Sequence, residues 1–225
     1  MDKVVAIIPA RGGSKRIPRK NIKDFHRKPL LAYSIEIALA SKLFDKIVVS
    51  TDDSEIASVA EAYGADIQIR PVDLSDDYSG TAEVIEYVLD NLKEKFDYVC
   101  TIYATAPLLQ SKYLINGFEK LKASDAINAF SATSMPFPIQ RTFKLNENGR
   151  CEMFTPEYYQ SRSQDLEEAY QDAGQFYWSK VGEKSDKIMF SEDSIPILLP
   201  RHLVQDIDTL EDWKRAEVMY EVINR

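Results

Sequence analysis

From residue 4 to residue 133 the chain alternates between short apolar segments and amphipathic segments, and no other feature constrains the fold as strongly. Apolar runs rich in β-branched residues predict buried strands, whereas apolar positions at helical spacing predict helices that cover those strands. Strand and helix in alternation predict βαβ units, so we expect an α/β fold whose doubly wound, mostly parallel sheet lies between two layers of helices. We expect strands at residues 4–8, 46–50, 66–69, 98–103 and 126–133, and helices at 29–42, 53–63, 81–96 and from Ser111 onward.

The alternation stops after Met135. Residues 139–145 and 150–154 flank the turn sequence Asn-Glu-Asn-Gly, which predicts a hairpin. Polar and aromatic residues without a clear period follow. We therefore interpret residues 1–225 as one domain, with residues 135–180 inserted as a hairpin and aromatic element. The remaining expected elements are strands at 174–178, 195–199 and 203–207 and a closing helix at 208–224.

The charge balance excludes one broad class of partner. The chain carries a formal net charge of −8, whereas a general nucleic-acid-binding surface is basic. Its first residues, MDKVVAII, contain an apolar run far shorter than a membrane-spanning helix and no signal-peptide cleavage pattern. We expect a cytoplasmic protein with neither a nucleic-acid partner nor a membrane partner.

Against this acidic background, the loop after the first strand is strongly basic. It reads IIPARGGSKRIPRKN over residues 7–21, with two glycines and five basic side chains. Glycine lets the backbone approach a ligand closely, successive N–H groups can form an anion site, and arginine and lysine add charge for phosphate oxygens. The loop matches neither the P-loop nor the dinucleotide-binding fingerprint. It predicts a polyphosphate site, and the alternative is an ordinary solvated basic loop. The five basic residues are Arg11, Lys15, Arg16, Arg19 and Lys20.

Three separated motifs, in order along nearly the whole chain, carry a family resemblance. The first is PARGGSKRIPRKN, the second is Arg70-Pro71 followed by Ser79-Gly80-Thr81, and the third is VQDIDTLEDW at residues 204–213. Together they resemble the cytidylyltransferases that activate nonulosonic acids, the group of the CMP-sialic acid synthetases. The resemblance implies a nucleotide-diphospho-sugar transferase-like fold and the transfer of CMP from CTP to a nonulosonic acid, with release of pyrophosphate.

The segments expected at the sugar depart from the sialic acid enzymes. YATAP at 103–107 stands where an amide-bearing segment is typical, and RSQD at 162–165 and YQDAGQFYW at 170–178 also differ. With MPFPIQR at 135–141, these segments resemble the enzymes for pseudaminic acid, which is our expected substrate. Sialic or legionaminic acid remains an alternative, as does a metal-dependent glycosyltransferase that consumes a nucleotide sugar.

The resemblance also assigns roles to individual residues. Arg11, Lys15, Lys20 and Asp208 are the expected catalytic residues. The expected nucleotide contacts are Ala10, Arg11, Gly12, Gly13, Ser14, Lys20, Asn21, Arg70, Ser79 and Thr81. The expected sugar contacts are Tyr103, Thr105, Arg141, Arg162, Asp172 and Gln175. Relatives use a region comparable to residues 135–180 to form homodimers that complete each other's sugar pocket, so a homodimer is expected.

Asp206 and Asp208 are the candidate metal ligands. In extended backbone, side chains two residues apart project to one face, so the two carboxylates can share a Mg²⁺ ion. The alternative is that Asp208 caps the final helix, with Glu211 completing a capping box. That alternative leaves Asp206 unexplained.

Overall fold

The computed structural model describes residues 2–75, 80–183 and 188–225. Its helices are α1 (Leu30–Ser41), α2 (Ser54–Ala62), α3 (Thr81–Asn91), α4 (Ser111–Lys122) and α5 (Leu210–Ile223). Its strands are β1 (Val4–Pro9), β2 (Asp24–Phe25), β3 (Lys28–Pro29), β4 (Lys46–Thr51), β5 (Asp66–Ile69), β6 (Tyr98–Ile102), β7 (Asn128–Ser134), β8 (Phe143–Leu145), β9 (Cys151–Met153), β10 (Tyr170–Lys180) and β11 (Ser194–Leu198).

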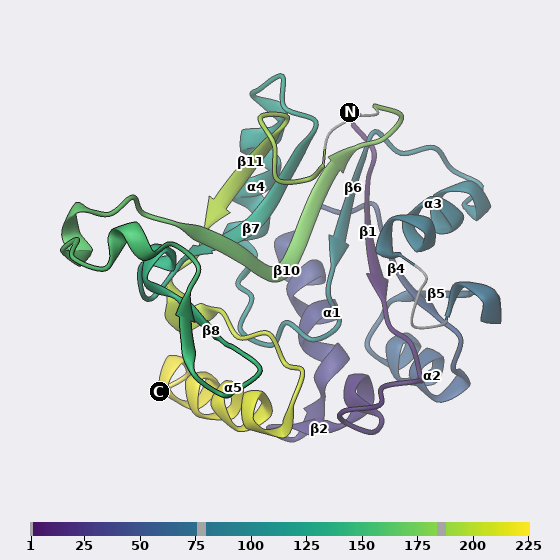
Figure 1. Ribbon diagram of the computed structural model, residues 1–225. Coiled ribbons are helices and arrows are strands. Elements are labelled where there is room, and N and C mark those ends of the chain that lie inside the picture. The colour runs from purple at the N-terminus through teal and green to yellow at the C-terminus, as the bar shows by residue number, and fades with distance from the viewer. Residues whose placement is uncertain (1, 76–79, 184–187) are drawn as a thin grey trace.

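Seven strands form the central sheet in the order β11-β7-β10-β6-β1-β4-β5 (Figure 1). β1 pairs in parallel with both β4 and β6, β4 pairs in parallel with β5, and β7 pairs in parallel with β11. β10 lies antiparallel between β6 and β7. The chain winds outward from β1 to β5 and then crosses back to β6 on the other side of β1, so the expected doubly wound, mostly parallel α/β fold is confirmed.

β1 shows why its sequence is apolar at every position. Val4, Ala6 and Ile8 face the cluster that includes α1, α2 and α4, whereas Val5 and Ile7 face the cluster under α3. A strand covered on both faces reads as a continuous apolar run. The layers are therefore α1, α2 and α4, then the sheet, then α3.

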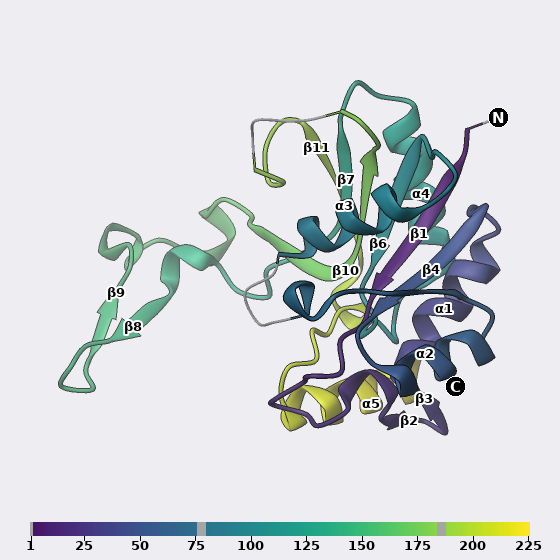
Figure 2. The same cartoon turned by 90° about the vertical axis from the view of Figure 1, so that its right-hand side faces the viewer.

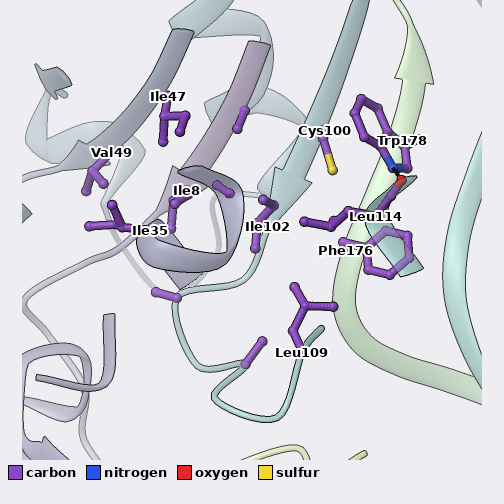
Figure 3. Close-up of a cluster of buried hydrophobic side chains, with 14 of the residues drawn as sticks. Ile8, Ile35, Ile47, Val49, Cys100, Ile102, Leu109, Leu114, Phe176 and Trp178 are labelled. Atoms are coloured by element: carbon purple, nitrogen blue, oxygen red, sulfur yellow. Dashed lines mark hydrogen bonds between the residues drawn. The ribbon is translucent and has the colours of Figure 1, made fainter. Parts of the chain in front are cut away.

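The largest cluster has aromatic side chains at its β10 end (Figure 3). Trp178 is fully buried and its Nε1 donates to the carbonyl of Leu114 over 3.2 Å. Gly117 of α4 faces this ring so closely that an added Cβ would lie 3.0 Å from Trp178 Cδ1. The glycine thus lets the helix lie directly on the aromatic layer of the sheet.

A separate apolar cluster joins the two ends of the chain. Ile17 of the basic loop, Phe25 and Ile207 pack together with Trp213 of α5. Ile207 has no exposed surface. The residue between the two candidate metal ligands is therefore fixed by packing, and the same packing holds the basic loop.

An arm leaves the sheet after β7 and returns as β10. It contains the β8–β9 hairpin, which Figure 2 shows standing away from the sheet and its helices. The returning strand begins at Tyr170 and runs through the middle of the sheet. The segment outside the sheet is therefore 135–169, and residues 170–180 belong to the central sheet.

Two expectations about local structure are wrong, and so is the alternative that Asp208 caps the last helix. Residues 203–207 form no strand; Arg201–Leu203 is a 3-10 turn, and the extended chain after it has no neighbouring strand to pair with. Helix α3 ends at Asn91 instead of continuing to Phe96. Asp208 does not cap the last helix, because Thr209 does so and exchanges capping hydrogen bonds with Asp212. No helix of the described residues has the length and apolar character needed to cross a membrane.

Candidate active site

A cleft of about 630 Å³ opens at the carboxyl ends of β1 and β6. This is the point where the strand order reverses, at which doubly wound sheets bind their ligands. The basic loop forms one wall, the start of α3 another, and the segment before α5 a third. The lining residues are Pro9, Arg11, Ser14, Lys15, Arg16, Lys20, Asn21, Arg70, Leu74, Thr81, Val84, Tyr103, Ala104, Thr105, Asp206 and Asp208.

Hydrogen bonds within the basic loop decide which of its donors face the cleft. The amide of Gly12 donates to Asp52 Oδ1 over 3.0 Å, and the amide of Ser14 donates to the carbonyl of Gly12 over 3.1 Å. The amide of Ala10 donates to the carbonyl of Ser50. The amides of Gly12 and Ser14, two of the three that we expected to serve a triphosphate, are thus engaged with the protein, as is the amide of Ala10. The loop residues that line the cleft are Arg11, Ser14, Lys15, Arg16, Lys20 and Asn21.

Asn21 and Lys20 follow in a short 3-10 turn. The Asn21 side chain is buried and its Nδ2 donates to the carbonyl of Arg11 over 2.9 Å, which ties the two ends of the loop together. Lys20 Nζ donates to the carbonyl of Ile207 over 2.6 Å and lies 3.5 Å from Asp208 Oδ1. The lysine therefore links the basic loop to the acidic segment.

Asp206 and Asp208 both line the cleft, as their spacing predicts. Burial raises the pKa of Asp206, and the neighbouring carboxylate of Asp208 adds to this rise. Asp208 Oδ1 also forms an ion pair with Arg16 Nη2, which lies 2.8 Å away. Two crowded carboxylates, one of them partly withdrawn from water, form a donor set that favours a hard cation.

Arg70 lines the same cleft as this acidic pair. Its side chain is largely buried, and its Nε donates to Ser75 Oγ over 3.1 Å. Burial lowers the pKa of Arg70, and the positive charge of Arg11 acts in the same direction. The protein thus keeps two guanidinium groups near each other at the cleft, which suits an anionic ligand.

Two of the six expected sugar contacts, Tyr103 and Thr105, line the cleft. The carbonyl of Tyr103 accepts from the buried hydroxyl of Ser34 over 2.7 Å. The ring of Tyr103 lies 5.2 Å from the ring of Tyr177, whose hydroxyl donates to Asp172 Oδ2 over 2.5 Å. Burial raises the pKa of Tyr177, so its hydroxyl stays protonated and can donate. Asp172 is thereby connected to the cleft through two tyrosines.

The other four expected sugar contacts, Asp172 among them, are absent from the lining of the cleft. Gln175 is 2% exposed and its Nε2 donates to the carbonyl of Leu203 over 2.5 Å, while its buried Oε1 has no partner among the described residues. Arg141 and Arg162 are exposed on the arm, and Arg162 pairs with Asp165 at 2.6 Å. Of the expected nucleotide contacts, Ser79 lies outside the described residues.

Sequence reasoning missed several residues that shape the site. Arg16 was seen only as part of a charge run, although it pairs with Asp208. Asp53 was seen only as the start of a helix and Asp52 was not singled out, although both contact the basic loop. The signal was available in part, because Asp52 and Asp53 follow β4 directly and the carboxyl ends of parallel strands share one edge of the sheet.

The fold and the cationic cleft at its switch point define an α/β nucleotide-binding protein of the nucleotidyltransferase class. Residues 5–181 match the family model described as cytidylyltransferase, and the chain belongs to this family. This membership excludes the glycosyltransferase alternative. The remaining assignments of individual residues to substrates stay predictions.

Three relatives indicate where the chain lies within this group. It is 49% identical over 226 residues to a pseudaminic acid cytidylyltransferase of Campylobacter jejuni, covering 98% of this chain and 97% of the relative. It is 32% identical to a CMP-N,N'-diacetyllegionaminic acid synthase of Legionella pneumophila, covering 98% and 97%. A solved CMP:2-keto-3-deoxy-manno-octonic acid synthetase complexed with CTP matches with a TM-score of 0.69 and 17% identity, covering 98% of this chain and 99% of that one. The last likeness concerns the fold alone, which is nucleotide-diphospho-sugar transferase-like.

Proposed function

We propose that this cytidylyltransferase transfers CMP from CTP to the anomeric hydroxyl of pseudaminic acid. The observation that carries the proposal is the cleft itself, which Arg11, Lys15 and Lys20 line together with Asp206 and Asp208. The near full-length identity to a pseudaminic acid cytidylyltransferase favours this sugar over its relatives. Membership in the family accounts for CTP as the nucleotide.

In the proposed reaction, the anomeric oxygen forms a bond to the α-phosphorus while the bond from that phosphorus to the pyrophosphate oxygen breaks. The proton of the hydroxyl is released, and pyrophosphate leaves. Such transfers depend mainly on positioning and on stabilising charge. Arg11, Lys15 and Lys20 would neutralise the charge that develops on pyrophosphate. Arg70, Asn21 and Thr81, which line the same cleft, would hold the nucleoside.

Asp206 and Asp208 are proposed to hold Mg²⁺. The two carboxylates offer hard oxygen donors, and the raised pKa of Asp206 marks a negative charge that a cation would stabilise. The described residues contain no group of three or more histidine, cysteine, aspartate or glutamate side chains that could form a metal cage. Substrate oxygens and water would therefore complete about six ligands. A bound Mg²⁺ ion supplies charge neutralisation and lowers the pKa of a coordinated hydroxyl.

The test is pyrophosphate release from CTP with purified pseudaminic, legionaminic and sialic acids, each as the only sugar. We expect release with pseudaminic acid to exceed release with the other two by at least about tenfold in kcat/KM. Equal rates with all three sugars would contradict the assignment of the sugar but not that of the reaction. Absence of release with every sugar would contradict the reaction as well.

We expect the enzyme to act in the cytoplasm, where CTP is available.

We further propose a homodimer built through the arm. Five large apolar or aromatic side chains on the arm are each at least 55% exposed, and a two-stranded hairpin is only marginally stable by itself. A second copy of the chain would cover this apolar surface and bring Arg141 and Arg162 to a neighbouring cleft. The apolar residues concerned are Phe137, Phe143, Leu145, Phe154 and Tyr159.

Subunit complementation tests the shared pocket. Arg162→Ala and Asp208→Ala would each be inactive alone, and mixed dimers would contain one intact site made from an unaltered arm and an unaltered acidic pair. Equal mixing, with exchange of subunits, should restore about a quarter of wild-type activity. A mixture that stays inactive while light scattering shows mixed dimers would refute the shared pocket. A monomeric wild-type protein would refute the dimer.

A further inference from the structure

One basic residue of the loop turns away from the cleft. Arg19 is absent from the cleft lining, and its guanidinium forms a two-pronged pair with Asp53, with Nη2 lying 3.0 Å from Asp53 Oδ1. The same Nη2 lies 2.5 Å from Glu55 Oε2. Bidentate pairing of a guanidinium with a carboxylate fixes orientation as well as distance. Arg19 thus contacts the β4–α2 turn, at the other side of the loop from the cleft.

The backbone of Arg19 is held in a conformation that few side-chain-bearing residues adopt. Its φ is 57°, in the left-handed region. This conformation costs about 1 kcal/mol or more for a residue other than glycine, so surrounding contacts must maintain it. The pair with Asp53 is such a contact. Lys20 and Asn21 follow immediately, so the position of Arg19 also sets where those two cleft residues lie.

Asp53 is itself rigid. Its Oδ1 accepts from the amides of Glu55 and Ile56, both over 3.0 Å, and so caps α2. The start of the basic loop lies against the same carboxylate, because a Cβ on Gly12 would lie 2.6 Å from Asp53 Oδ2. The amide of Gly12 donates to the adjacent Asp52. Both ends of the loop therefore rest on one turn, 34 to 41 residues away in sequence.

We propose that Asp53 and Arg19 are positioning residues for the triphosphate of CTP. By clamping both ends of loop 12–19 to the cap of α2, they hold Lys15 and Lys20 in place without touching the nucleotide. A pre-organised loop loses less conformational freedom when the triphosphate binds. The inference rests on the proposed function for CTP as the ligand. Its test measures the binding of phosphates directly, so that failure of the positioning role can be distinguished from failure of the proposed function.

The variants are Asp53→Asn, Arg19→Gln and the double variant. Asparagine retains an oxygen that can cap α2, so the fold should persist while the charged pair with Arg19 is lost. The matched control is Asp66→Asn, which removes an exposed ion pair with Lys46 at 2.6 Å on the far edge of the sheet. Calorimetric titrations with CTP, inorganic tripolyphosphate and cytidine report the binding of the whole nucleotide, of its phosphates and of its nucleoside.

We expect Asp53→Asn and Arg19→Gln each to weaken CTP and tripolyphosphate binding by about tenfold, with cytidine binding and the control unchanged. Both single changes break the same contact, the pair between Arg19 and Asp53. The double variant should therefore bind CTP no more weakly than the weaker-binding single variant. Unchanged tripolyphosphate affinity in folded Asp53→Asn would overturn the proposal, as would equal weakening of cytidine. Wild-type binding of tripolyphosphate without pyrophosphate release from CTP and any sugar would instead refute the proposed function alone.

Discussion

Replacing Ile207 by alanine should weaken metal binding by Asp206 and Asp208 to a greater extent than the loss of folding stability explains. Ile207 is 0% exposed and packs against Phe25 and Trp213, while Asp206 and Asp208 on either side line the cleft. The change removes three carbon atoms, or about 2.4 kcal/mol at about 0.8 kcal/mol each, and the cavity raises the expected loss to about 2–5 kcal/mol. The two carboxylates would then lose the anchor between them.

The matched control is Leu121→Ala in α4, which also removes three carbons from a side chain with 0% exposure, remote from the cleft. Urea unfolding should give similar losses for the two variants. The Mg²⁺ concentration for half-maximal pyrophosphate release, and Mn²⁺ binding followed by electron paramagnetic resonance, should weaken by about fivefold or more for Ile207→Ala alone. Equal metal affinity in the two variants would refute the reasoning that buried Ile207 aligns the ligands.

Three further results follow from the same contacts. Asp208→Asn should lower turnover by at least about a hundredfold, and because Thr209 caps α5 the free energy of unfolding should change by less than about 0.5 kcal/mol. Thr209→Ala should instead lower the free energy of unfolding in urea by about 1 kcal/mol and leave turnover largely unchanged. Gly12→Ala should cost about 1–3 kcal/mol, because its Cβ would collide with Asp53, whereas Gly13→Ala meets no atom within 4 Å and should stay within about 0.5 kcal/mol. The pair with Arg19 lowers the pKa of Asp53 from 3.8 to about 2, so its stabilising contribution is present above pH 3.8 and is lost as the pH falls towards 2. The difference in unfolding free energy between wild type and Asp53→Asn should therefore be at most about 2 kcal/mol at neutral pH and shrink across that window; a constant difference would show that the charge of Asp53 is irrelevant.

The parallel half of the fold could be read from the sequence because its signals are local. A doubly covered strand such as β1 is apolar at every position, and the helix expected at residues 29–42 is present as α1, Leu30–Ser41. The errors arise where tertiary contacts override local preference. Residues 203–207 resemble a strand, but Leu203 and Ile207 are buried by packing and no neighbouring strand is available to them. Helix α3 ends early although Phe96 is still buried under it.

The residues of the site fall into the same two groups: some are recognisable from local sequence, and others are brought together only by tertiary contacts. Arg11, Lys15, Lys20 and the acidic pair could be recognised because each group is contiguous in sequence and carries a chemical reason for its spacing. The pairing of Arg19 with Asp53 could not be foreseen, because it joins residues 34 positions apart. For the same reason, the sequence offered no means of separating Arg19 from the four other basic residues that face the cleft.

The place of β10 in the sheet constrains how the chain can fold during synthesis. β6 and β7 are neighbours in sequence but not in space, since β10 separates them. Until residues 170–180 leave the ribosome, the backbone hydrogen-bonding groups on the facing edges of β6 and β7 have no partner strand, and open edges of this kind recruit other chains. Truncated or stalled products that end within the arm should therefore aggregate, and the full-length protein should depend on chaperones that shield nascent strands more than a sheet assembled in sequence order would.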